Sequence, residues 1–253
     1  MVLTDRLLLL FALVLDSCLA VILLRQRRHE EFPFFFIYVA SCMVIMTVRL
    51  SVMGNYAAYF NVFWASEPIE ALLILLALHE AFRKVFLPFY QFWWFWFVFP
   101  GAVAIISGFV VSAAIQHPPA APSLRIAVIL SSSKSIHYVE AGLFGVFFLL
   151  VWLLGLRWQN YPFGIVMGFA AVALGAGYSF AARSAFGTKF NTLAKYGPAM
   201  AYILAVAIWL IVFLLPSAEQ IPTEGTNTIR PEQVLREVRQ YTRVLKGFFG
   251  KHQ

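Results

Sequence analysis

Long apolar runs separated by short polar segments dominate the chain. Seven of these runs are long enough to cross the roughly 30 Å hydrocarbon core of a bilayer as helices. They cover residues 3–24, 33–53, 64–82, 92–116, 136–156, 163–182 and 197–215. Proline or glycine stands at most junctions, as at Pro33, Gly54, Pro88 and Gly187, where such residues commonly begin or end helices. The pattern predicts an all-α, seven-helix transmembrane domain over 1–215, followed by a cytoplasmic tail.

Composition leads to the same class of protein. Of the 253 residues, 61% are hydrophobic and only 12% are charged, whereas soluble domains average about 25% charged residues. We therefore expect a multi-pass protein of the plasma or inner membrane. Cys18 and Cys42 both lie in apolar runs, which is typical of buried cysteines rather than of a disulfide or a metal pair. The first run has no basic start and carries Asp16, so we expect a retained helix rather than a cleaved signal peptide.

The distribution of basic residues predicts the orientation. Most of the 19 lysines and arginines fall in the tail or in alternate loops. Those in the loops are Arg25, Arg27, Arg28, Arg83, Lys84 and Arg157. Cytoplasmic segments carry an excess of such residues. The N-terminus is therefore predicted to lie outside and the C-terminus inside.

Two parts of the chain resemble copies of one three-helix unit. Phe60, Asn61 and Pro68 align with Phe190, Asn191 and Pro198 at nearly the offset that separates Pro33 from Pro162. The first three and last three runs would then be parallel repeats, with the fourth run between them (a 3+1+3 arrangement). Chance recurrence in a chain with 26 phenylalanines is the alternative.

Ionisable residues inside the apolar runs are the candidates for function. Six of them are predicted to lie in one layer near the outer ends of four helices, and we name them the outer polar cluster: Arg49, Glu67, Glu70, His137, Glu140 and Arg183. Glu67 and Glu70 are three residues apart and share a helix face, as do His137 and Glu140. Charged groups within a membrane usually pair with one another or meet a substrate.

Three interpretations of the outer polar cluster stay open. It could be a structural network of ion pairs near the interface. It could be a small-molecule site, in which Arg49 and Arg183 hold a carboxylate or phosphate and the acids hold an amine or hydroxyls. It could also be a metal site built from Glu67, Glu70, His137 and Glu140, although di-iron bundles have the reverse order, Glu-x-x-His.

Asp16 and the tail carry the remaining candidate chemistry. Asp16 lies well inside the first run with no evident partner at its depth. It could be a protonated or hydrogen-bonded core acid, or part of a proton path. The tail, 216–253, ends in a basic amphipathic pattern, in which Arg236, Arg239, Arg243 and Lys246 stand between apolar residues. Such a helix is typical of binding to the anionic inner leaflet, and docking to a protein partner is the alternative. The net charge of +7 is explained by this tail and the loops, so nucleic acid binding is not expected.

Two stretches resemble known membrane modules. "EPIEALLILLALHEAFRKVF" and "FPFFFIYV" are similar to segments of bacterial seven-helix proteins and of membrane sensor modules found ahead of histidine kinases. The 3+1+3 arrangement resembles that of small carriers and opsin-like receptors. The resemblance covers roughly residues 1–215 and implies a sensor-like or carrier-like protein. The chain has no Pro-Gln dipeptide of the carrier type, and its seventh run has no lysine for a retinal Schiff base.

No catalytic signature is evident. The sequence has no Gly-rich phosphate loop and no His-Glu-x-x-His helix, and neither a catalytic residue nor a cofactor is predicted. We expect a small-ligand-binding membrane protein of the sensor or receptor type that acts through a separate protein partner. A small-solute carrier and an accessory subunit of a larger membrane complex are the alternatives.

Overall fold

The structure, a computed structural model, describes residues 3–116, 124–156 and 160–215. These residues are almost entirely helical and contain no strand. The α-helices are α1 (Leu3–Arg25), α2 (Arg28–Glu31), α3 (Pro33–Ser51), α4 (Tyr56–Val85), α5 (Val98–Gln116), α6 (Leu124–Leu153), α7 (Asn160–Phe186) and α8 (Asn191–Leu214). Short 3₁₀ segments are η1 (Leu87–Gln91), η2 (Trp93–Phe97) and η3 (Gly187–Phe190). Seven helical segments are long and apolar enough to cross a membrane, which confirms the prediction of an all-α chain with seven such helices.

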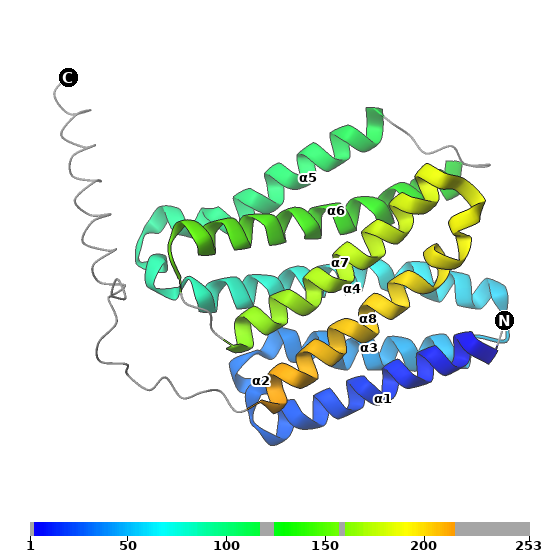
Figure 1. The fold of residues 1–253 in the computed structure, drawn as a ribbon, viewed down its shortest axis with the longest axis horizontal. Coiled ribbons are helices and arrows are strands. Elements are labelled where there is room, and N and C mark those ends of the chain that lie inside the picture. Colours follow the sequence, from blue (N-terminus) through cyan, green and yellow to red (C-terminus); the bar gives the residue numbers. More distant parts are fainter. Residues whose placement is uncertain (1–2, 117–123, 157–159, 216–253) are drawn as a thin grey trace.

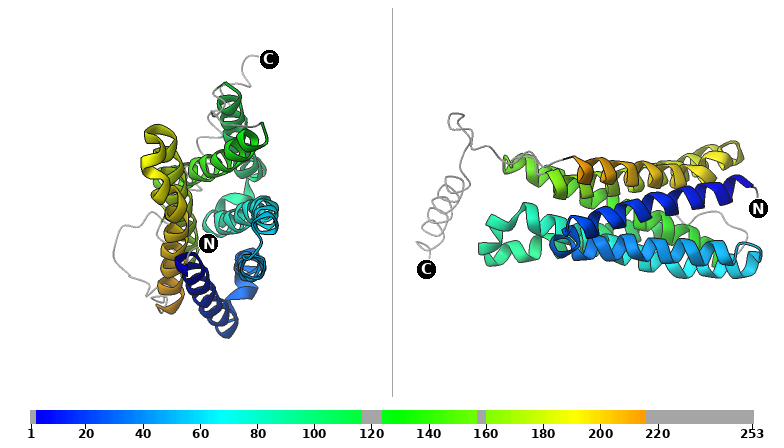
Figure 2. Two further views of the ribbon diagram at one scale, coloured as in Figure 1. Left: turned by 90° about the vertical axis from the view of Figure 1, so that its right-hand side faces the viewer. Right: turned by 90° about the horizontal axis from the view of Figure 1, so that it is seen from below.

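The long helices lie side by side in one bundle (Figure 1). α1 packs on α3 and α3 on α4, while α6 packs on α7 and α7 on α8. Contacts of α1 with α8 and of α4 with α7 join these two groups. α5 packs mainly on α6 and lies at the edge of the bundle (Figure 2). We refer below to the N-terminal end of the bundle, where the chain begins, and to the opposite end, which holds α2.

Four helices, α4, α6, α7 and α8, are longer than the apolar pattern predicted, and the difference is largest for α4. The runs 64–82 and 136–156 correspond to α4 and α6, and each of these helices has 30 residues. The pattern identifies only the segment that is apolar enough to lie in the hydrocarbon core of a bilayer, whereas the helix continues beyond that segment. α4 begins after Asn55, whose side chain accepts hydrogen bonds from the backbone N–H groups of Ala57 and Ala58, as N-cap residues do. Pro68 therefore lies inside a helix rather than near its start.

Close contact between α7 and α8 forms the tightest part of the core. A Cβ atom added at Gly164 would collide with Val212, one at Gly168 with the indole of Trp209, and one at Gly175 with Ala201. Small residues allow two helix backbones to approach closely in this way. Gly164, Gly168 and Gly175 of α7 thus form a packing surface for α8.

A glutamate from α4 supports the start of α3. Glu80 accepts hydrogen bonds from the backbone N–H groups of Phe34 (3.4 Å) and Phe35 (3.1 Å). The first N–H groups of a helix have no partner within the helix, and Pro33 at the first turn lacks one altogether. Glu80 therefore has a structural role at the opposite end of the bundle.

Candidate functional site

The centre of the outer polar cluster is an ion pair between α3 and α4. Nη2 of Arg49 lies 2.6 Å from Oε1 of Glu70 and also donates a hydrogen bond to Ser66. The guanidinium lies over the ring of Phe63, 4.7 Å from its centroid. Pairing with a carboxylate and contact with an aromatic face both stabilise a guanidinium that is mostly removed from solvent.

A second pair belongs to α6. Nδ1 of His137 lies 3.1 Å from Oε2 of Glu140, one helical turn along, and the imidazole stacks on the ring of Phe180 from α7. Only 3% of Glu140 is exposed. The two residues therefore share a face of α6 that is turned into the bundle, as their spacing predicted.

Glu67 connects the two pairs electrostatically. It interacts with Glu70 on its own helix and with His137 on α6. Five of the six predicted members are thus brought together. The exception is Arg183, whose side chain is exposed and forms no ion pair with a described residue. Glu70 lies near the middle of α4 rather than in its first two turns, because α4 begins at Tyr56. His137 and Glu140 lie near the start of the apolar segment Ser135–Leu153 of α6, as their place in the sequence predicted.

Two buried polar atoms of the outer polar cluster have no hydrogen-bond partner. They are Nε of Arg49 and Oε1 of Glu140. Buried polar groups are nearly always hydrogen-bonded to protein, water or ligand. Nε of Arg49 belongs to a cationic donor, and Oε1 of Glu140 is an acceptor.

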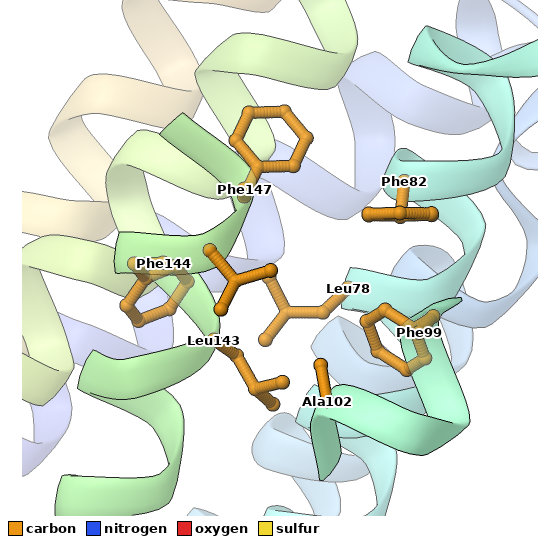
Figure 3. A pocket seen from close by; sticks show the side chains of 8 residues that line it. Leu78, Phe82, Phe99, Ala102, Leu143, Phe144 and Phe147 are labelled. Carbon is orange, nitrogen blue, oxygen red and sulfur yellow. The ribbon is translucent and has the colours of Figure 1, made fainter. Parts of the chain in front are cut away.

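The metal interpretation finds no geometric support in the described part of the chain. No three His, Cys, Asp or Glu side chains there come together as a metal site requires. A small cavity of about 10 Å³ does lie between α4, α5 and α6, but its lining is apolar and includes Leu78, Phe99 and Phe144 (Figure 3). A cavity of this size has room for about one water molecule and does not involve the outer polar cluster.

Asp16 has a partner that the sequence did not reveal. Its carboxyl group lies 2.9 and 3.0 Å from the hydroxyl of Tyr202 on α8. The side chains of Tyr38 and Cys42 from α3 lie beside this contact and interact with it electrostatically. Sequence spacing gave no signal for this group, because its members come from three helices and two of them are aromatic residues within apolar runs.

Two further polar contacts join α1 to α8, one near each end of the two helices. At the N-terminal end Nζ of Lys195 lies 2.9 Å from Oδ1 of Asp5. At the opposite end the side-chain amide of Gln26 donates to the carbonyl of Phe213, at 2.9 Å. We call this line of contact the α1–α8 seam, and the Asp16–Tyr202 contact lies between its two ends.

The predicted membrane-surface residues of the tail, Arg236, Arg239, Arg243 and Lys246, lie outside the described residues. Comparison with protein-family models, with curated proteins and with solved structures finds no match to this chain.

Proposed function

We propose that this chain is a multi-pass protein of the plasma or inner membrane that binds a small polar ligand at the outer polar cluster. It acts as a sensor or receptor through a separate protein partner. The observation that carries the proposal is the pair of unsatisfied buried atoms, Nε of Arg49 and Oε1 of Glu140, within a group of charged residues from α3, α4 and α6. Ionisable residues within a membrane are rare and mark substrate or ion pathways, proton relays and ligand sites.

The chemistry of these atoms defines the ligand class. A guanidinium N–H recognises a carboxylate or phosphate oxygen, and a carboxylate oxygen recognises an amine or hydroxyl hydrogen. A small amino acid or hydroxy acid carries both groups. Such a ligand would satisfy Arg49 and Glu140 together and would join α3 to α6.

The 3+1+3 repeat and the orientation with the N-terminus outside belong to the same proposal. In support of the repeat, Pro68 and Pro198 both lie inside their helices, α4 and α8, and Pro33 and Pro162 both lie in a first turn, of α3 and α7. The order of packing is also the same within α1, α3 and α4 as within α6, α7 and α8.

The orientation predicts a labelling pattern. In a background with Cys18 and Cys42 replaced by alanine, Gly54→Cys, in the α3–α4 connection, should react with a membrane-impermeant thiol reagent in intact cells. Glu30→Cys, in α2, should react only after the membrane is permeabilised. Both positions are exposed, so accessibility to the reagent depends on the side of the membrane. The reverse pattern would contradict the orientation.

Ligand binding predicts a specific change in thermal stability. Amino acids and small hydroxy acids are added at millimolar concentration to the detergent-purified chain, and the unfolding temperature is recorded. At least one compound should raise it, because a ligand that binds only the folded state stabilises that state. The increase should be lost in Glu140→Gln and Arg49→Lys and retained in Lys195→Gln, a matched change in the α1–α8 seam. No increase with any compound, or an increase that survives both cluster substitutions, would refute the site.

A carrier is the second candidate, and the α1–α8 seam favours it. α1 and α8 belong to different copies of the proposed repeat, and carriers built from repeats place their substrate site at the interface between the copies. Uptake of the stabilising compound into proteoliposomes separates the two functions. Binding without uptake supports the sensor, and uptake that fails in Glu70→Gln supports the carrier. Co-purification with a larger assembly, without binding or uptake, would instead identify an accessory subunit.

A further inference from the structure

Asp16 is fully enclosed by the bundle. It lies near the middle of α1 with 0% of its surface exposed, and Tyr202 is its one hydrogen-bond partner among the described residues. The tyrosine has a single hydroxyl proton, which satisfies one carboxyl oxygen at a time. An ionised carboxylate has about four acceptor sites. Most of the acceptor capacity of an ionised Asp16 would therefore remain unused.

No positive charge in the part of the chain that the structure describes compensates Asp16. Among the described residues, no lysine, arginine or histidine lies within ion-pair distance of it. The groups that face it from the neighbouring helices are Tyr202 of α8 and Tyr38 and Cys42 of α3, which are neutral. Beyond them lies Glu70 of α4, which is an acid and is already paired with Arg49.

Burial without a counter-charge favours the neutral acid. An isolated buried carboxylate is so costly that such a group takes up a proton instead. A metal ion is a poor alternative, since one carboxylate and one hydroxyl supply far fewer than the six to eight oxygen ligands of calcium or the octahedral set of magnesium. A proton needs only the carboxyl group itself, and the hydroxyl of Tyr202 fixes the orientation of that group.

We propose that Asp16 is a proton-binding site of this protein, which holds its proton while the α1–α8 seam is closed. When the seam opens, water reaches the carboxyl group, the O–H bond breaks and the proton passes to water, leaving the carboxylate. Closure of the seam reverses the step. The proposal rests on residues separate from the outer polar cluster and stands whether or not that cluster binds a ligand.

Infrared spectroscopy tests the proton directly. The full chain is placed in lipid nanodiscs at neutral pH, and the carbonyl-stretch region of protonated carboxylic acids is compared between wild type and Asp16→Asn. The band of a protonated acid should be present in wild type and lost in Asp16→Asn. It should remain in Glu140→Gln, the matched change in the outer polar cluster. Identical spectra of wild type and Asp16→Asn in this region would overturn the proposal.

A second variant keeps the test informative if Asp16→Asn fails to fold. Tyr202→Phe removes the hydrogen bond and retains the ring, so the band should move to higher frequency. A band that stays unshifted in Tyr202→Phe would belong to another acid and would overturn the assignment. The double variant Gln26→Ala, Lys195→Gln loosens both ends of the seam, and deuterium exchange of the acid proton should become several-fold faster. An unchanged exchange rate would refute control by the seam.

Discussion

Replacement of Trp209 by alanine is expected to lower the free energy of unfolding by about 3–5 kcal/mol, the usual range for deletion of a buried Trp or Phe side chain. The indole is 0% exposed, and the rings of Phe35 and Phe169 lie 5.1 and 5.0 Å from it, centroid to centroid. Its Nε1 donates to the carbonyl of Ile165 at 3.2 Å. Removal of the ring opens a cavity among α3, α7 and α8 and also leaves that carbonyl without its side-chain donor.

Trp152→Ala is the matched control. The same side chain is deleted, but Trp152 on α6 is 76% exposed, so no cavity forms and the change should stay within about 0.5 kcal/mol, as for most surface substitutions. Unfolding of both variants is followed in the same detergent by far-ultraviolet circular dichroism. This signal reports helix content and does not depend on the tryptophan that is deleted. Equal losses in the two variants would show that Trp209 does not hold the three helices together as the structure implies.

The contrast between these two tryptophans shows which features of the fold can be predicted from the sequence alone. Apolar length identifies the helices, since each bilayer-spanning segment needs a minimum run of apolar residues. It does not give the rotation of each helix about its axis, because nearly every face is apolar. Trp152 and Trp209 therefore look alike in sequence, and only the packed bundle separates them. Small residues carry more information, because Gly168, Ala171 and Gly175 recur every three or four residues in the sixth run, a spacing typical of close helix contact.

The candidate site could likewise be predicted from the sequence only in part. The spacing of His137 and Glu140 predicted a shared face, which is a local property of one helix. Arg49 and Glu70 were placed in one layer by topology, and the structure brings them into contact. The partner of Asp16 could not be predicted, because Tyr202 is distant in sequence and a tyrosine in an apolar run gives no sign of its hydrogen bond. Arg183 was misplaced, since depth alone does not determine which face a residue occupies.

The second large effect is expected from the ion pair of Arg49 and Glu70. Arg49 and Glu70 are partly buried, with 12% and 26% of their side chains exposed. Removal of one partner should therefore cost about 3 kcal/mol, the lower end of the range for a buried pair, because the other charge is left uncompensated. The two substitutions should nevertheless differ. Glu70→Met leaves a guanidinium that cannot lose its proton, whereas Arg49→Met leaves a carboxyl group that can become neutral by taking one up. We therefore expect the larger loss of stability from Glu70→Met.

The double variant Arg49→Met, Glu70→Met distinguishes scaffolding from function. Replacement of a whole buried pair by apolar side chains is often neutral or stabilising, so the double variant should lose far less stability than the sum of the single variants. Thermal unfolding of wild type, the two single variants and the double variant gives the coupling energy between Arg49 and Glu70. Additive losses of stability would show that the two side chains do not form a pair. If the stable double variant also fails to respond to the compounds that stabilise wild type, the charges are required for ligand binding rather than for folding. A stable double variant that still responds would leave the ion pair a structural role alone.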